Sequence, residues 1–282
     1  MPLEEALTAA SDGIEAGPTG RASGDRRTQT VGLCVAAEAR RILRDRRMYL
    51  ALAIPIALAS ATVLGVVRVM VSQNMAPDVA GSVPLAMSIG GLVMALILGV
   101  GLLSMVSREM ADGTVTTAVR FVPDRLRLLV ARSASYVAVS TAGALMWLIG
   151  VAIVILSVLH GPPGLARSLA LIALAGTVAT ALAVLMMVSL VTALPNGAVA
   201  LALLLVLNLV LPLGVALLNQ LTSGSLTRLV DVVSRILPGS LLMQAMDPVS
   251  GTFATVVGGL AGLIIWCAGF FVAAYMRMRV IQ

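Results

Sequence analysis

Residues 168–194 read SLALIALAGTVATALAVLMMVSLVTAL and contain no Asp, Glu, Lys, Arg or His. The hydrocarbon core of a bilayer is about 30 Å thick, and a helix that rises about 1.5 Å per residue crosses it in about 20 residues. This stretch is therefore long enough and apolar enough to span a membrane. Its apolar residues are continuous instead of alternating, which favours a helix over a strand of a membrane β-barrel.

The rest of the chain repeats this pattern. Five further stretches are also free of charge and long enough to span a membrane: residues 48–67, 83–106, 135–159, 198–218 and 253–275. The composition agrees, because 59% of the residues are hydrophobic and only 11% are charged. We therefore predict an all-α, polytopic membrane protein in which residues 31–282 form one domain with six transmembrane helices.

The arginines indicate how this domain is oriented. The net charge is +6, and all 19 basic residues are arginine. If the N-terminus is cytoplasmic, only Arg68, Arg167, Arg228 and Arg235 lie on the opposite side, so the positive-inside rule predicts that both termini are cytoplasmic. The basic charge then follows from the membrane orientation, and we expect no nucleic-acid partner. The absence of lysine is typical of a GC-rich bacterial genome, which suggests the bacterial inner membrane.

The region before the first span divides into two parts. Residues 1–30 are polar and contain no apolar run, so we expect a disordered cytoplasmic tail. Residues 31–47 combine helically spaced apolar residues with a basic face, which predicts an amphipathic helix at the inner membrane surface. That basic face comprises Arg40, Arg41, Arg44 and Arg47. The alternative is an ordinary basic flank that binds anionic lipid.

The segment 107–132 is the one substantial loop on the predicted cytoplasmic side. Gly113 is placed to end the preceding helix in a left-handed conformation, and Asp124 is placed to cap the next one. Between them, residues 115–122 have the spacing of a two-turn helix. Arg120 and Phe121 give this helix a surface suited to a partner protein. The alternative is a short helix that faces lipid.

The outer loop 219–251 and two residues of the fifth predicted span are weaker indications of a pathway through the membrane. The outer loop 219–251 has the pattern of a helical hairpin, with Arg228, Asp231 and Arg235 spaced to pair along one face. This hairpin could gate a pathway or simply pack on the bundle. Asn208 and Pro212 place a polar group and a kink in the fifth span, where ordinary helix packing is the main alternative.

The chemistry of an enzyme is missing. The single histidine, His160, lies beside a Gly-Pro-Pro turn, and no nucleophile–base pair, metal-ligand set or pair of facing carboxylates can be assembled. A phosphate-binding loop of the usual kind needs a lysine, which the chain lacks. We therefore expect a non-catalytic chain that binds no cofactor or metal, with energy supplied by a partner.

Two segments carry a resemblance to a known family. EARRILRDRR at 38–47, followed by a first span that contains Pro55, resembles the connecting helix of permease subunits of type-2 ABC exporters, which include daunorubicin-type drug exporters. REMADGTV at 108–115 with PDRL at 123–126 resembles the stretch that supplies the coupling helix of that family. The resemblance runs from residue 31 to the C-terminus.

The resemblance implies a function. Residues at positions that match the family or its contact with the ATPase are Glu109, Gly113, Thr114, Thr117, Arg120, Phe121 and Pro123, while Asp124 stands where the family often has serine. Two permease subunits, identical or related, would line an outward path for a drug-like amphiphile or a lipid. Separate cytoplasmic ATPases would bind ATP and Mg²⁺ and push through the coupling helices. The alternatives are a non-transport membrane scaffold or sensory protein, and a channel.

Overall fold

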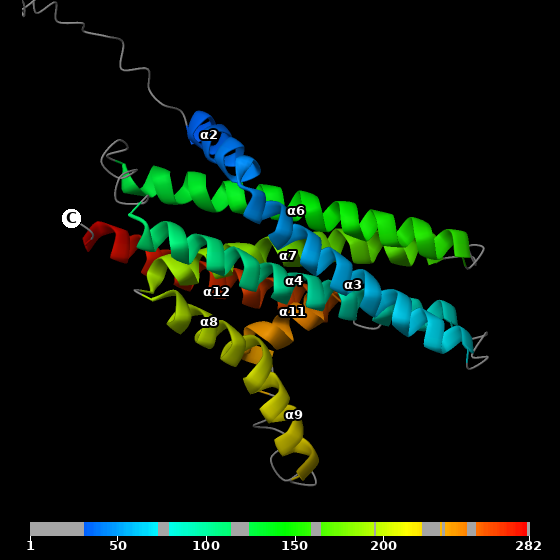
Figure 1. The fold of residues 1–282 in the computed structure, drawn as a ribbon. Coiled ribbons are helices and arrows are strands. Elements are labelled where there is room, and N and C mark those ends of the chain that lie inside the picture. Colours follow the sequence, from blue (N-terminus) through cyan, green and yellow to red (C-terminus); the bar gives the residue numbers. More distant parts are fainter. Residues whose placement is uncertain are drawn as a thin grey trace, which may run out of the picture.

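The computed structural model describes residues 31–72, 79–113, 124–158, 165–194, 196–221, 232, 235–246 and 252–280, and every element among them is helical (Figure 1). The long helices are α3 (Arg46–Ser72), α4 (Val79–Ala111), α6 (Arg125–Val158), α7 (Leu165–Ala193) and α12 (Phe253–Val280). The shorter ones are α2 (Val31–Arg44), α8 (Gly197–Leu205), the π-helical turn η1 (Val206–Val210), α9 (Leu211–Leu221) and α11 (Pro238–Met246).

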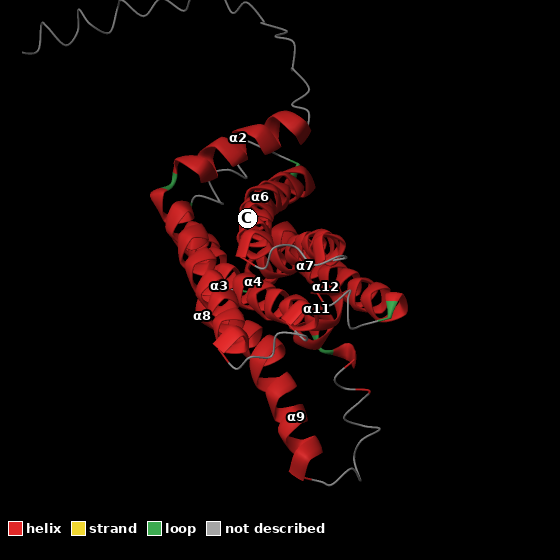
Figure 2. Ribbon diagram, turned by 90° about the vertical axis from the view of Figure 1, so that its right-hand side faces the viewer, coloured by secondary structure: helices red, strands yellow, loops and turns green. Residues whose placement is uncertain are grey.

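Five helices of the described chain are long and apolar enough to cross a membrane. They coincide with five of the six predicted stretches, which confirms an all-α fold compatible with a polytopic membrane protein. The five helices run alongside one another in Figure 1. Figure 2 looks nearly along the bundle and shows α2 lying across it.

The bundle is built around α4 and α7. In the most apolar part of each helix, 56% of α4 and 50% of α7 are buried, compared with 28% of α3 and 22% of α12. The two central helices contact each other closely at Gly99, where a β-carbon would lie 2.0 Å from the sulfur of Met187. A glycine here lets the neighbouring side chain lie against the backbone, a common arrangement in membrane helices.

The sixth predicted span, 198–218, does not form one long helix. It begins at α8, where the side chain of Asn196 accepts a hydrogen bond from the N–H of Ala198, and is interrupted by η1. Pro212, two residues after η1, has no N–H to donate to the carbonyl four residues earlier, so the helix widens at this point. After η1, α9 diverges from the bundle (Figure 1).

The outer hairpin predicted at 219–251 is described only in part. Its second arm is α11, which begins at Pro238. Proline suits the first position of a helix because that N–H needs no partner. The helix α11 is largely buried against α12, since a β-carbon at Gly259 would lie 2.8 Å from the carbonyl oxygen of Leu241. It therefore packs inside the bundle instead of lying on its surface.

Candidate functional site

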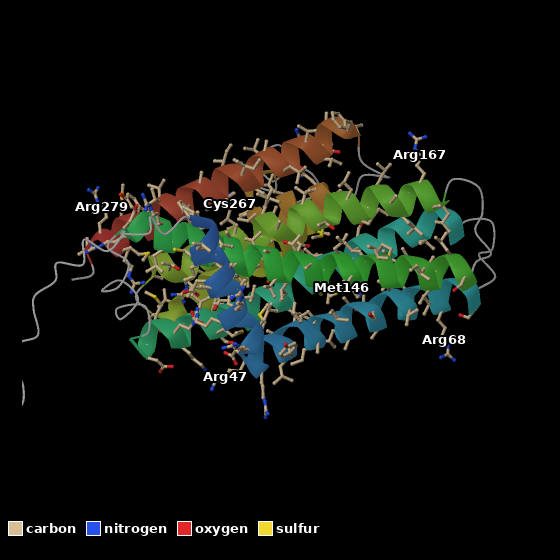
Figure 3. The ribbon with its side chains drawn as sticks, turned by 90° about the horizontal axis from the view of Figure 1, so that it is seen from above. Arg47, Arg68, Met146, Arg167, Cys267 and Arg279 are labelled. Carbon is tan, nitrogen blue, oxygen red and sulfur yellow. The ribbon has the colours of Figure 1, made fainter. Side chains whose placement is uncertain are left out.

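One end of the bundle gathers the starts of α3 and α6 and the ends of α4, α7 and α12. Figure 3 marks it with Arg47 and Arg279, while Arg68 and Arg167 lie at the opposite end. We call these the Glu109 end and the Arg68 end. Residues 107–113 and 124–132, the described parts of the segment predicted to bind a partner, belong to the Glu109 end.

The roles predicted for Gly113 and Asp124 at the ends of the two flanking helices are confirmed. Gly113 has a φ of 69°, the left-handed conformation expected after the end of α4. Asp124 accepts a hydrogen bond from the N–H of Arg127 at 3.2 Å, which caps the start of α6. Thr114, Thr117, Arg120 and Phe121, and with them the predicted coupling helix, lie outside the described residues.

Glu109 occupies the centre of a polar cluster at this end. Its carboxylate accepts hydrogen bonds from the Arg41 guanidinium at 2.8 Å, from Tyr136 Oη at 3.0 Å and from Arg132. Glu38 adds a second ion pair to Arg41 at 2.8 Å. We call these five residues the Glu109 cluster, and they join α2, α4 and α6.

The cluster is mostly removed from water. The side chain of Glu109 is 16% exposed and that of Arg132 is 9% exposed, whereas the side chain of Arg41 is 44% exposed. Tyr136 is fully buried. A buried carboxylate needs compensating charges and donors, and Glu109 has both.

The electrostatic balance at Arg41 follows from this geometry. Burial of its guanidinium lowers its pKa, but the hydrogen bond and the charge of Glu109, followed by those of Glu38, raise the pKa by more. The net effect is a pKa above the usual value of arginine. Arg41 therefore stays charged throughout the pH range in which the protein can be studied.

A second contact fixes α2 across α6. Ser135 Oγ donates a hydrogen bond to the backbone carbonyl of Val35 in α2 at 3.0 Å and shares its proton with the carbonyl of Ala131. Ser135 is fully buried, and so is Ile42 on the same side of α2. Together with the Glu109 cluster, this contact ties α2 to the bundle at two places along its length.

The break between α2 and α3 occurs at Asp45. Its side chain accepts a hydrogen bond from the N–H of Arg47 at 2.9 Å, and its carbonyl accepts one from the N–H of Met48. Aspartate favours such a capping position over a helix interior. The amphipathic helix predicted at 31–47 therefore ends at Arg44, and Arg47 belongs to α3.

Arg41 also departs from the predicted basic face. The prediction placed the four arginines together, opposite the apolar residues, but Arg41 turns toward Glu109. Arg40, Arg44 and Arg47 remain exposed, and so does Leu43. The outer face of α2 is thus mixed, because it carries both arginines and leucines.

Two other arginines tie the ends of helices together. Arg125 at the start of α6 donates to the backbone carbonyls of Met278 and Arg279 at 2.8 and 2.5 Å. Arg277 donates to the carbonyls of Thr192 and Leu194 at the end of α7. The last carbonyls of a helix have no hydrogen-bond partner within the helix. A cationic side chain at this end supplies the missing hydrogen bonds and interacts favourably with the helix dipole. These hydrogen bonds therefore link α6 to α12 and α12 to α7.

The predicted path residues lie elsewhere. Asn208 is 6% exposed; its Nδ2 donates to the carbonyl of Leu204 and its Oδ1 has no partner among the described residues. Gly239 of α11 contacts the backbone of Asn208, since a β-carbon there would lie 2.4 Å from the Asn208 carbonyl oxygen. Pro212 lies in α9, and Arg235 precedes α11. Arg228 and Asp231 lie outside the described residues.

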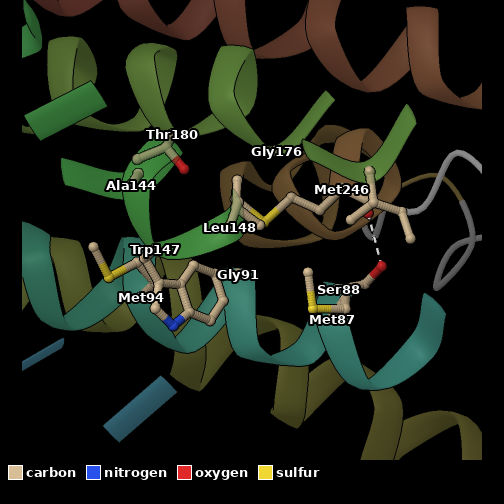
Figure 4. Close-up of a pocket in the computed structure, with 11 residues that line it drawn as sticks. Met87, Ser88, Gly91, Met94, Ala144, Trp147, Leu148, Gly176, Thr180 and Met246 are labelled. Atoms are coloured by element: carbon tan, nitrogen blue, oxygen red, sulfur yellow. Dashed lines mark hydrogen bonds between the residues drawn. The ribbon is translucent and has the colours of Figure 1, made fainter. Parts of the chain in front are cut away.

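Two cavities are lined by described residues. A cavity of about 10 Å³ lies among α4, α6, α7 and α11 (Figure 4), enough for one water molecule. Ser88 borders it and donates to the carbonyl of Met246 at 2.7 Å. A groove of about 440 Å³ lies between α3 and α6, with the hydrogen bond from Trp147 to Ser60 at its base. No group of three or more metal-binding side chains occurs among the described residues.

No protein-family model matches the chain, and no curated protein matches it.

Arg132, Tyr136 and Glu38 were not predicted as site residues. Tyr136 is buried and donates a hydrogen bond to Glu109. The sequence did hold a signal, because Arg132 and Tyr136 are four residues apart on α6 and therefore share one face. Glu109 also follows the apolar run 83–106, and Arg132 precedes the next run, 135–159. In two consecutive membrane helices these positions lie at the same membrane surface, where the opposite charges can pair.

Proposed function

We propose that this chain is the permease subunit of a type-2 ABC exporter in a bacterial inner membrane, with both termini cytoplasmic. The Glu109 cluster is the observation that carries the proposal. It fixes the last turns of α4 and the first turns of α6, and these two helices flank residues 114–123. A force applied to that segment would therefore reach α2, α4 and α6 together.

The five long apolar helices support a membrane subunit. If ATP drives the transport, the lysine of the phosphate-binding loop must come from a partner, because this chain contains no lysine. In this proposal Thr114, Thr117, Arg120 and Phe121 contact the ATPase. Glu109 and Gly113 hold the segment in place. Two permease chains, identical or related, form the path.

The cargo is an amphiphilic drug-like molecule or a lipid. The support for this choice is that the five long helices have charges only at their ends, while the interior polar groups are neutral, such as Ser88 and Asn208. An isolated ion would meet no compensating charge along such a path, whereas an apolar molecule needs none.

Co-purification tests the proposal. The chain should be isolated from its native membrane in mild detergent, and an ATPase chain with a phosphate-binding loop should accompany it. Isolation of the chain with no nucleotide-binding partner would favour the competing reading, a membrane scaffold or sensory protein whose cytoplasmic loop binds something else.

The contact itself is tested in the purified complex. Phe121→Ala should leave the bundle folded but abolish the dependence of ATP hydrolysis on the permease, because an aromatic side chain is a typical anchor of an interface. Phe253→Ala is the matched control, since Phe253 is 86% exposed and begins α12, at the opposite end of that helix from Arg279. Equal ATPase coupling in both variants would remove Phe121 from the interface.

A further inference from the structure

The outer face of α2 combines exposed arginines with exposed leucines. Arg40 and Arg44 are one turn apart, and Leu33 and Leu43 on the same helix are 63% and 45% exposed. Past the break, Arg47, Tyr49 and Leu50 continue the exposed surface. None of Arg40, Arg44 and Arg47 makes an ion pair with a carboxylate in the part of the chain that the structure describes.

The orientation of α2 follows from two attachments, one made directly to α6 and one made to Glu109 of α4, which in turn bonds α6. Val35 contacts Ser135, and Arg41, six residues later, reaches Glu109, which also bonds Tyr136. Six residues correspond to about 9 Å along α2. Both attachments nevertheless meet the same turn of α6, so α2 lies crosswise to α6 (Figure 2). When α6 spans a membrane, α2 lies in the plane of that membrane.

The depth of α2 also follows from α6. Arg132 is the last charged residue of α6, and only uncharged residues follow it to Val158. The contact at Ser135 therefore places α2 where the hydrocarbon core begins, at the level of the phospholipid headgroups. The inner face of α2 is occupied by the bundle, which leaves the face with Arg40 and Arg44 to meet the lipid.

We propose that the outer face of α2, with Arg40, Arg44 and Arg47, is a binding site for the headgroups of anionic phospholipids of the inner leaflet. Arginine suits this role because its planar guanidinium binds two phosphate oxygens at once. Arg40 and Arg44 are one helical turn apart on α2, so one phosphate can lie between them, and Arg47 adds a third positive charge at the start of α3. Leu33 and Leu43 enter the first part of the acyl-chain region.

Glu109 contributes to this site indirectly. It takes Arg41 out of the outer face and holds α2 against α6, so the remaining arginines are presented in a fixed row. The site belongs to this chain alone and does not depend on an ATPase. Its test can therefore fail while the proposed transport function stands, and the reverse also holds.

The test uses the full-length chain in phosphatidylcholine vesicles with a trace of spin-labelled phosphatidylglycerol or spin-labelled phosphatidylcholine. The motionally restricted fraction of each label reports which lipid contacts the protein. The unmodified chain should prefer phosphatidylglycerol, and Arg40→Gln/Arg44→Gln should lower this preference by roughly fivefold or more, given the attraction of each arginine to an anionic surface.

Arg68→Gln/Arg167→Gln is the matched control, because it removes the same charge from the Arg68 end (Figure 3). The control should keep the preference. No preference in the unmodified chain, an unchanged preference in the α2 variant, or an equal loss in both variants would overturn the site.

Hydrogen exchange on the unmodified chain gives an independent readout. Amides 31–44 should exchange several-fold more slowly in vesicles that contain phosphatidylglycerol than in phosphatidylcholine alone, while amides of α7 should not change. Equal exchange of residues 31–44 in the two kinds of vesicle would contradict the proposal even if a variant failed to fold.

Discussion

At the scale of single residues, Glu109 is the position at which the most interactions converge. It is a mostly buried carboxylate that compensates two arginines from different helices. Removing one partner of a buried charge pair is costly because it leaves the other charge in a poorly solvated place. The free energy of unfolding should therefore depend more strongly on Glu109 than on any exposed acidic residue nearby.

Glu109→Gln should lower the free energy of unfolding by about 3 kcal/mol, because Arg132 is left without a compensating charge. The measurement is the thermal or denaturant unfolding of the purified chain in detergent. Glu38→Gln is the matched control, since Glu38 shares only the half-exposed Arg41 and should cost less than about 1 kcal/mol. Similar losses in the two variants would contradict the central position of Glu109.

Tyr136→Phe removes a single donor to Glu109 and keeps the ring in place. A hydrogen bond to a charged acceptor contributes about 1.5–3 kcal/mol, so the variant should be destabilised by roughly that amount. Combining it with Glu109→Gln in the same unfolding assay should give less than the sum of the two effects, because the residues act on one another. Additive losses would show that the phenol and the carboxylate are independent.

At the scale of helices, the long apolar stretches were predictable from sequence and the shorter elements less so. A charge-free run of about 20 residues or more usually forms a membrane helix, which is why α3, α4, α6, α7 and α12 were all anticipated. The run 198–218 is the exception, because η1 interrupts it. Gly113 and Asp124 were also anticipated, since each has a local conformational reason. The ends of helices therefore came from local chemistry.

What could not be predicted depends on contacts between helices far apart in the chain. The direction of Arg41 is set by Glu109, which lies 68 residues away, and no pattern within α2 reveals it. The placement of α11 inside the bundle likewise depends on Gly259 of α12 and on Ser88 of α4. The hydropathy pattern placed α11 in an outer loop, but it did not indicate which helices bury α11.

The contact between α11 and η1 makes a prediction at this scale. Gly239→Ala places a β-carbon 2.4 Å from the backbone carbonyl oxygen of Asn208, and a backbone atom cannot move aside as a flexible side chain can. The variant should lose about 1–3 kcal/mol of unfolding free energy. Gly258→Ala, where a β-carbon meets open space, is the control and should be neutral or slightly stabilising. Equal stability of the two variants would show that α11 packs differently.

At the scale of the whole molecule, the charges divide the bundle into two unlike ends. The Glu109 end holds an ion-pair cluster and two arginines that cap the ends of other helices, so α2, α4, α6, α7 and α12 are all connected there. Away from this end, α9 diverges from the bundle (Figure 1). We expect a push at the connected end to move several helices as a unit, which suits a chain driven from the cytoplasm.

The most direct test of this account places a photo-crosslinking amino acid at position 121 in the native host, with position 253 as the control. The account predicts that position 121 crosslinks to a nucleotide-binding ATPase chain in the cytoplasm, and that position 253 does not. Labelling of residue 121 by a membrane-impermeant reagent applied outside the cell, or crosslinks at 121 that contain no ATPase, would contradict it.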